Sequence, residues 1–269
     1  MHIYLDSADK ELIKKSAKRI DGVTTNPSLL KQSVSNVQQP LHEYVHDIFE
    51  IMQKKPVSLE VAGGSSMEMY KQAKALYRRF SSIRHHVVIK IPINMYHQEH
   101  HASLEVIHAL AKEKIPTNVT LIFTPEQALI AAKAGATYVS PFVGRMDDFL
   151  RKRHGIQFNK NDYYPSFGWK EHGYTLEDNG VISGVHLVEQ IAKIYTIHKY
   201  TTKIIAASLR HVRQIRECAL AGAHIATISY ELLSAMEHHE LTQKGNDAFI
   251  HDTIEEYKAL MNDEARIQY

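Results

Sequence analysis

A single lysine lies inside a short apolar segment, residues 86–92 (HVVIKIP). The segment is rich in β-branched residues and ends in proline, which predicts a buried strand. A buried ammonium group is costly unless it is paired or loses its proton. Lys90 could end its strand and reach water, with its stem packed on apolar neighbours. Alternatively, desolvation keeps the amine near neutrality, which is the form that attacks a carbonyl to make a Schiff base.

Other polar side chains follow the predicted strands at or near their carboxyl ends. Asp6 and Glu60 are carboxylates in such positions, and each has an ordinary explanation as a helix cap or an ion-pair partner. If the strands converge on one mouth, however, so many charged and polar side chains in one place would be energetically unfavourable, and this favours a functional site. The set comprises Asp6, Asn26, Glu60, Lys90, Asn118, Thr120, Ser140, Arg145, Ser208 and Arg210.

The elements that must position these residues alternate regularly along the chain. Short apolar segments are separated by amphipathic or alanine-rich ones, which predicts an α/β fold with a parallel sheet closed as a single (β/α)8 TIM barrel. A doubly wound sheet usually has a glycine-rich phosphate loop after its first strand, and residues 6–9 (DSAD) are not such a loop. The predicted strands are residues 3–6, 22–25, 57–61, 86–92, 116–123, 137–142, 203–208 and 224–228.

The alternation stops after the sixth strand. Residues 146–180 contain four glycines and a cluster of aromatic side chains, with no clear period. Long segments of this kind are usually functional or disordered, and the aromatic residues argue against disorder. We therefore expect an aromatic-rich insertion over about 146–180, either a lid or a subunit contact. We expect one barrel domain over residues 1–269, with C-terminal helices over about 230–269 and a turn near 242–246.

The composition excludes several classes of function. The chain has 32 basic and 30 acidic residues, a balance that does not favour nucleic acid or an anionic membrane as a partner. No apolar run approaches the ~20 residues of a membrane span, and the first residues lack the pattern of a signal peptide. Cys218 is the single cysteine, so no intrachain disulfide or cysteine metal cluster can form. We expect a cytoplasmic protein.

The 18 histidines raise the question of a metal site. His97 and His101 are one helical turn apart in residues 97–101 (HQEHH), a spacing that some metal sites use. A lone spacing match without a forced third ligand is weak evidence, so we expect no metal ligands here.

The polar residues above lie in motifs that resemble the transaldolase family, of the compact bacterial type that includes fructose-6-phosphate aldolases. The two long motifs are residues 22–29 (GVTTNPSL) and 140–145 (SPFVGR). Shorter matches occur at 5–8 (LDSA), 58–61 (SLEV), 89–92 (IKIP), 117–123 (TNVTLIF) and 206–210 (AASLR). They follow the family's order, each at the end of a predicted strand.

The resemblance implies class I aldol chemistry, with no metal and no organic cofactor. Lys90 would form the Schiff base with a ketose phosphate. Asp6 would take the proton from the hydroxyl that becomes the aldehyde, and Glu60 with Thr120 would hold a water for proton transfer. A lysine that must be neutral to attack needs its pKa lowered from the usual ~10.4.

The resemblance also implies the residues that bind substrate. Asn26 and Asn118 would hydrogen-bond the hydroxyls of the retained three-carbon unit, in a pocket that Ser140 lines. Arginine offers paired donors suited to phosphate oxygens. The residues implied to bind the distal phosphate are Arg145, Ser208 and Arg210.

Two positions distinguish transfer from plain aldol cleavage. Glu60 and Phe142 are transaldolase-like, since the related aldolases tend to carry glutamine and tyrosine there. The implied function is therefore a transaldolase acting on sugar phosphates, which we expect to be a homo-oligomer. The alternatives are a fructose-6-phosphate aldolase-type lyase using the same lysine, or a barrel that binds sugar phosphate without catalysis. Residues 93–99 (INMYHQE) depart from the family's usual threonine or serine followed by glycine.

Overall fold

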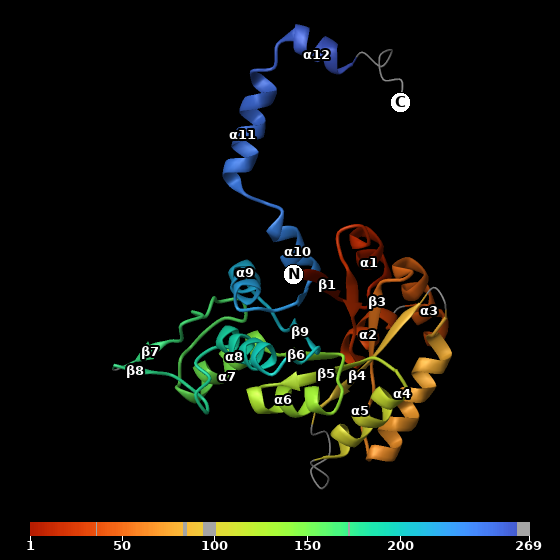
Figure 1. Cartoon of the computed structure of the whole chain (residues 1–269). Coiled ribbons are helices and arrows are strands. Elements are labelled where there is room, and N and C mark those ends of the chain that lie inside the picture. The colour runs from red at the N-terminus through yellow and green to blue at the C-terminus, as the bar shows by residue number, and fades with distance from the viewer. Residues whose placement is uncertain (36, 83–84, 94–100, 172, 263–269) are drawn as a thin grey trace. The chain divides into compact units, whose positions relative to one another are not determined.

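The computed structural model describes residues 1–35, 37–82, 85–93, 101–171 and 173–262. The chain divides into two compact units, Met1–Leu232 and Leu233–Tyr269 (Figure 1). Residues 94–100 lie outside the described residues. They include His97 and most of the segment 93–99 that departs from the family pattern.

The first unit is a closed barrel of parallel strands, as the sequence predicts (Figure 1). The strands follow one another around the barrel in the order β1-β10-β9-β6-β5-β4-β3-β2. Their ends differ from the predicted ones by at most two residues. They are β1 (His2–Asp6), β2 (Gly22–Thr24), β3 (Pro56–Glu60), β4 (His86–Pro92), β5 (Thr117–Ile122), β6 (Tyr138–Pro141), β9 (Lys203–Ala206) and β10 (Ile225–Ile228).

Helices connect the strands, and several begin at side chains that cap them. Ser65 and Glu68 form a reciprocal capping box at the start of α4, and Thr124 does the same with Gln127 at α6. The helices of the first unit are α1 (Lys10–Ser16), α2 (Pro27–Val34), α3 (Leu41–Met52), α4 (Ser66–Phe80), α5 (Ala102–Lys112), α6 (Pro125–Lys133), α7 (Val143–Arg153), α8 (Gly184–Ile197) and α9 (Val212–Leu220). The helix α10 (Tyr230–Met236) crosses the boundary at Leu232.

Apolar and aromatic side chains fill the barrel interior away from the carboxyl ends of the strands. Tyr4 packs in a buried cluster with Val88 and Ile205. The polar residues of the strands lie closer to the carboxyl ends, where barrel enzymes have their active sites. The neighbouring strand must carry a glycine beside this tyrosine, because a Cβ on Gly22 would lie 2.6 Å from the Tyr4 ring. The barrel interior therefore has an apolar layer below the polar side chains at the carboxyl ends of the strands.

The segment after β6 differs from the prediction at its start. Residues 143–153 form the helix α7, although the sequence from Met146 showed no clear period. The buried face of α7 carries Asp147 and Arg151 together with apolar residues, so its helical pattern is hidden by charged residues. It is α8, further along, that packs against β6 and β9 in the usual place of a barrel helix.

The rest of the segment is ordered around one buried arginine. The Arg151 guanidinium lies 4.8 Å from the ring centroid of Phe158 and 5.0 Å from that of Tyr164. A short antiparallel pair, β7 (Lys170–Glu171) and β8 (Tyr174–Thr175), follows. The role of this segment as a lid or subunit contact stays a prediction.

The second unit contains α11 (Glu240–His251) and α12 (Glu255–Met261). The expected turn near 242–246 is wrong, since α11 runs through it. The break comes earlier, where the His239 ring accepts a hydrogen bond from the Leu241 backbone and caps α11. Within the described residues, no helix is long and apolar enough to cross a membrane.

Candidate active site

Lys90 lies on β4 between the ends of β3 and β5. The register places Glu60 beside it on one side and Asn118 on the other. Only 6% of Lys90 is exposed, so the ammonium does not extend to water. Its Nζ lies 3.0 Å from Oε2 of Glu60 and donates to the backbone oxygen of Thr25 at 3.2 Å. The buried charge is therefore paired, as a desolvated ammonium requires.

Asp6, at the end of β1, faces the same interior. The Oγ1 of Thr24 donates to its Oδ1 at 2.8 Å. Burial raises the pKa of Asp6 above its ordinary value, and the positive charges of Lys90 and Arg145 offset this only in part. A carboxylate with a raised pKa is a stronger base than a solvated one, which suits proton transfer.

A buried hydrogen-bonded chain orients the amide next to Lys90. Ser140 Oγ donates to Asn118 Oδ1 at 2.7 Å, and Asn118 Nδ2 donates to Ser58 Oγ at 3.4 Å. Because the side-chain oxygen of Asn118 accepts from Ser140, its amide nitrogen must point toward Ser58. Asn118 thus offers N–H donors to the interior in a defined orientation.

Thr120 follows on β5, opposite Pro92 in the register. It is 1% exposed, and its hydroxyl has no hydrogen-bond partner among the described residues. A buried hydroxyl without a partner costs free energy, so such a group usually serves a bound water or ligand. This observation fits the expectation that Thr120 helps to hold a water.

A cavity of about 120 Å³ opens above Lys90. It brings together most of the predicted residues but not Glu60, Asn118, Thr120 or Arg210, which do not line it. Its lining consists of Asp6, Thr24, Asn26, Lys90, Ser140, Phe142, Arg145, Ala207, Ser208 and Thr227.

Two threonines of this cavity, Thr24 and Thr227, were not among the predicted site residues. The Oγ1 atoms of Thr24 and Thr227 lie 2.6 Å apart, although 203 residues separate them in the chain. Thr24 lies within the long motif 22–29, and Thr227 is a polar residue in an apolar strand. Either signal could have drawn attention to them.

Asn26 has two roles available. It caps α2, because its Oδ1 accepts a hydrogen bond from the Leu29 backbone at 3.0 Å. The side-chain oxygen of Asn26 is therefore used as a helix cap. The amide nitrogen is the group left to face the cavity.

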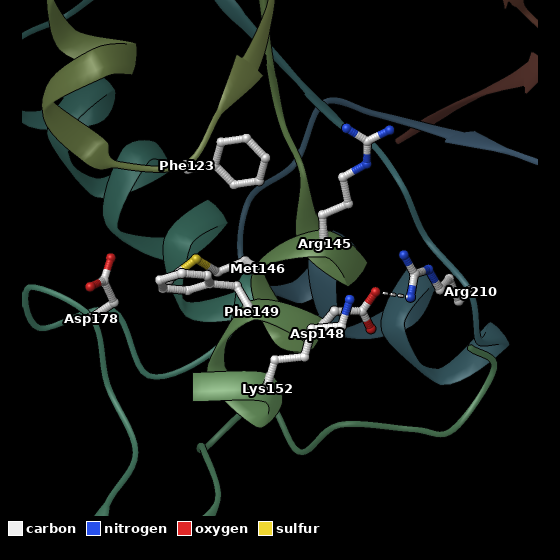
Figure 2. Close-up of a pocket in the computed structure, with 8 residues that line it drawn as sticks. All are labelled: Phe123, Arg145, Met146, Asp148, Phe149, Lys152, Asp178 and Arg210. Carbon is white, nitrogen blue, oxygen red and sulfur yellow. Dashed lines mark hydrogen bonds and ion pairs between the residues drawn. The ribbon is translucent and has the colours of Figure 1, made fainter. Parts of the chain in front are cut away.

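Arg145 lines both this cavity and a larger one of about 570 Å³, whose lining residues are drawn in Figure 2. Its guanidinium lies 5.1 Å from the centroid of the Phe142 ring, and that ring packs on Phe123 at 5.8 Å. Arg145 is exposed and lies on the first turn of α7. It is therefore a cation at the entrance to the buried lysine.

Arg210 does not reach the cavity of Lys90. It lines the larger cavity, where its guanidinium pairs with the carboxylate of Asp148 (Figure 2) and donates to the Lys160 backbone oxygen at 3.3 Å. Asp148 was not expected, because it belongs to the segment with no recognisable period. Ser208 lines the small cavity. Its backbone has a left-handed φ of 59°, and its carbonyl oxygen accepts a hydrogen bond from the Gly144 backbone at 3.1 Å.

Comparisons with known proteins agree with the motifs. The family model of Transaldolase/Fructose-6-phosphate aldolase matches residues 3–269. A relative from Exiguobacterium sibiricum named "Probable transaldolase" is 38% identical over 255 residues, which cover 94% of this chain and 97% of the relative. Relatives of the same name from Kosmotoga olearia and Clostridium botulinum are each 37% identical, over 96% and 94% of this chain and 98% and 96% of their own lengths.

The fold also matches a more distant solved structure. A crystal structure titled as a lactate oxidase of Pediococcus acidilactici superposes with a TM-score of 0.50 at 13% identity. The match covers 85% of this chain and 62% of that one. At this identity the similarity concerns the fold alone.

Proposed function

Since the chain belongs to the transaldolase/fructose-6-phosphate aldolase family, we propose that it is a transaldolase that moves a dihydroxyacetone unit between sugar phosphates through a Schiff base on Lys90. The observation that carries the proposal is the buried pair of Lys90 and Glu60, with Nζ and Oε2 3.0 Å apart. A carboxylate at that distance can accept the proton that the lysine must lose before it attacks.

The first step joins Lys90 to the ketone carbon of a ketose phosphate. The free amine attacks, and the carbinolamine loses water to give an iminium. Glu60 carries the protons of this dehydration. The Thr120 hydroxyl, which has no hydrogen-bond partner in the part of the chain that the structure describes, holds the departing or attacking water. The buried position of both groups supports these roles, because proton transfer in a water-poor site needs its carriers in place.

The second step breaks a carbon–carbon bond. Asp6 takes the proton of the hydroxyl on the departing carbon, the bond electrons move into the iminium, and an aldose phosphate leaves while an enamine stays on Lys90. The raised pKa of Asp6 supports its role as this base. In the reverse direction the enamine attacks an acceptor aldehyde, and Asp6 returns the proton to the new hydroxyl.

The retained three-carbon unit occupies the small cavity. Asn26 hydrogen-bonds its hydroxyls in the cavity that Ser140 lines. We assign Asn118 to the same unit: it does not itself line the cavity, but Ser140 donates to its oxygen and so fixes the direction of its N–H groups. Phe142 has no hydroxyl to deliver a proton or a water to the enamine. A slow release of the unit follows, which favours transfer over plain aldol cleavage.

The phosphate group extends into the larger cavity. Arg145 is its first anchor, because it borders both cavities. We assign Ser208 and Arg210 to the same phosphate, with Asp148 holding the Arg210 side chain in the absence of an anion. The rotation of Arg210 from carboxylate to phosphate is part of this proposal.

We further propose that the protein is a homo-oligomer in the cytoplasm. Exposed apolar side chains on α11 and α12, among them Phe249, Ile250 and Leu260, support a subunit contact. Oligomer size by light scattering, with and without α11 and α12, tests this.

The experiment that tests the function is a paired assay with fructose 6-phosphate, with and without erythrose 4-phosphate. Wild type is expected to make sedoheptulose 7-phosphate only when the acceptor is present. Release of free dihydroxyacetone without the acceptor would instead identify the protein as a fructose-6-phosphate aldolase-type lyase. Absence of product in both assays would favour a barrel that binds sugar phosphate without catalysis.

Borohydride trapping identifies the lysine. With fructose 6-phosphate, the wild-type chain should gain a covalent adduct on the peptide that contains Lys90, and Lys90→Met should gain none. Lys55→Met is the matched control, since Lys55 is also partly buried but its Nζ donates to the backbone oxygens of Ala17 and Ile20 instead of a carboxylate. An adduct on a different lysine would exclude the proposed mechanism.

A further inference from the structure

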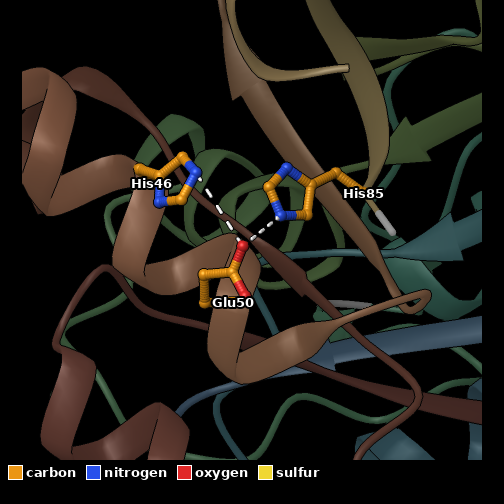
Figure 3. Close-up of side chains that lie close together, drawn as sticks. All are labelled: His46, Glu50 and His85. Atoms are coloured by element: carbon orange, nitrogen blue, oxygen red, sulfur yellow. Dashed lines mark hydrogen bonds and ion pairs between the residues drawn. The ribbon is translucent and has the colours of Figure 1, made fainter. Parts of the chain in front are cut away.

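Three metal-ligating side chains meet away from the active site. His46 and Glu50 lie one turn apart on α3, and His85 directly precedes β4 (Figure 3). One ligand atom from each residue lies within 4.8 Å of the others. The sequence did not suggest this group, because 35 residues separate Glu50 from His85.

The group lies at the opposite end of the barrel from the reaction. His85 comes before the first residue of β4, whereas Lys90 lies near the last. Lys90 lies four steps along the strand from His86, at ~3.3 Å a step. A ligand bound here would therefore not touch the Schiff-base lysine, and the inference does not depend on the proposed function.

The hydrogen bonds of His85 determine which ring nitrogen carries the proton. Its Nδ1 lies 2.9 Å from the backbone oxygen of Phe80. A carbonyl oxygen can only accept, so Nδ1 must be the protonated nitrogen. In the neutral ring Nε2 then presents its lone pair, and this lone pair faces Oε1 of Glu50 at 3.0 Å.

Two electron-rich atoms at this distance need a cation between them. A second proton on His85 would satisfy Glu50 but would leave His46 without a role. The Nε2 of His46 faces the same Glu50 oxygen at 3.8 Å. A metal ion satisfies both imidazoles and the carboxylate at once, which a single proton cannot do.

The surroundings hold the His85 ring in this orientation. It stacks on Phe49 with ring centroids 5.2 Å apart, and the His46 ring meets it edge-on at 5.3 Å. A histidine whose Nδ1–H is bound to a backbone carbonyl is the usual arrangement of a metal ligand. His46 and Glu50 are exposed, so an ion can enter from solvent and keep a water.

We propose that His46, Glu50 and His85 bind one Zn²⁺ ion, with water as the fourth ligand. Two imidazoles and one carboxylate are a ligand set that zinc takes in tetrahedral sites. Zinc bonds of ~2.0–2.1 Å place neighbouring tetrahedral ligands ~3.3 Å apart. The two contacts to Glu50, at 3.0 and 3.8 Å, lie on either side of this value. The bound ion would fasten α3 to the segment that enters β4.

The test uses the full-length chain, stripped of metal by a chelator, and Zn²⁺ in competition with a chromophoric chelator. Because the chain has 18 histidines, the measured quantity is the difference between variants. Wild type should bind one more zinc per chain than His46→Ala, Glu50→Gln or His85→Ala. Co²⁺ in the same site should give the strong visible bands of a tetrahedral complex, and these should disappear in the same variants.

His42→Ala is the matched control. His42 lies on the same helix one turn before His46, but it is not part of the group. This variant should keep the wild-type stoichiometry. At zinc about 100-fold above Kd, the melting temperature of wild type and His42→Ala should rise by several degrees, and that of His46→Ala should not.

His46 is exposed, so its replacement by alanine should leave the fold intact, and circular dichroism of the variant checks this. Equal zinc binding by wild type and His46→Ala would overturn the proposal. Absence of the extra zinc in wild type would do the same, and would leave His85 and Glu50 as a protonated ion pair.

Discussion

Lys90 and Glu60 face each other across β4 and β3, with Nζ and Oε2 3.0 Å apart and both side chains largely buried. Breaking such a pair leaves an uncompensated charge in a poorly solvated place, which is strongly unfavourable. Each group is therefore needed to compensate the charge of the other. The carboxylate also lies close enough to accept the proton that the lysine must lose before it can attack a carbonyl.

Glu60→Gln removes the charge but keeps the shape. We expect turnover in the transfer assay to fall ~100-fold, since a positioned acid–base group contributes 10²–10⁴. The proportion of free dihydroxyacetone should rise, because the related aldolases carry glutamine at this position by resemblance. Glu113→Gln, which removes the exposed partner of Lys74, is the control and should keep full activity. Unchanged turnover in Glu60→Gln would exclude Glu60 as the proton carrier.

Thr120→Val separates catalysis from stability. The hydroxyl has no partner among the described residues, so its removal should leave the free energy of unfolding unchanged or slightly raised. Turnover should fall ~10- to 100-fold if the hydroxyl holds a reactive water. Thr117→Val is the matched control, because its buried hydroxyl on the same strand also has no partner among the described residues. A variant as active as wild type would contradict the proposed water site.

Asp148→Asn tests the phosphate site. The substitution removes the carboxylate that competes with phosphate for Arg210. We expect the KM for fructose 6-phosphate to fall several-fold and inhibition by inorganic phosphate to strengthen, with kcat little changed. Steady-state kinetics measures both. A higher KM would mean that Asp148 holds Arg210 in its binding position instead.

Asp147 should make the stability depend on pH. Burial raises its pKa from 3.8 to about 7, against the hydrogen bonds from Gly184 and Gln214. The folded state thus binds the proton more tightly than the unfolded state. Stability from this group is complete below pH ~4 and is lost as pH rises to about 7, by on the order of 4 kcal/mol.

Asp147→Asn should remove this loss. Its oxygen can accept from Gly184, and its amide can donate to Gln214 after that side chain turns over. Denaturant unfolding at pH 5 and pH 8 should show a smaller difference for the variant than for wild type. Glu126→Gln, which removes an exposed carboxylate, is the control. Equal pH dependence in wild type and Asp147→Asn would contradict the raised pKa.

Gly144→Ala should disturb the phosphate side of the mouth. A Cβ at this position would lie 2.3 Å from the backbone oxygen of Ser208, so the start of α7 must shift. We expect a loss of ~1–3 kcal/mol in stability, as for other overpacked sites, and a higher KM because Arg145 is the next residue. Gly245→Ala, with open space around it within α11, should instead be neutral or stabilising. Normal stability and KM in Gly144→Ala would show that the backbone adapts.

The sequence alone determined the barrel and most of the residues at its mouth. Strand periodicity and apolar composition are local properties, so they can be recognised without contacts. In a closed parallel barrel, the carboxyl ends of all strands meet at one mouth. Asp6, Lys90 and Ser140 could therefore be assigned to one site before any distance was known, and the cavity includes all three.

The tertiary structure decided which groups pair with which. Arg210 pairs with Asp148 on α7, a helix whose buried face carries charges and so has no visible period. Thr24 meets Thr227, and His85 meets Glu50, across long separations in the chain. Such contacts depend on how helices and loops pack around the barrel, and the spacing of residues along the chain does not encode that packing locally.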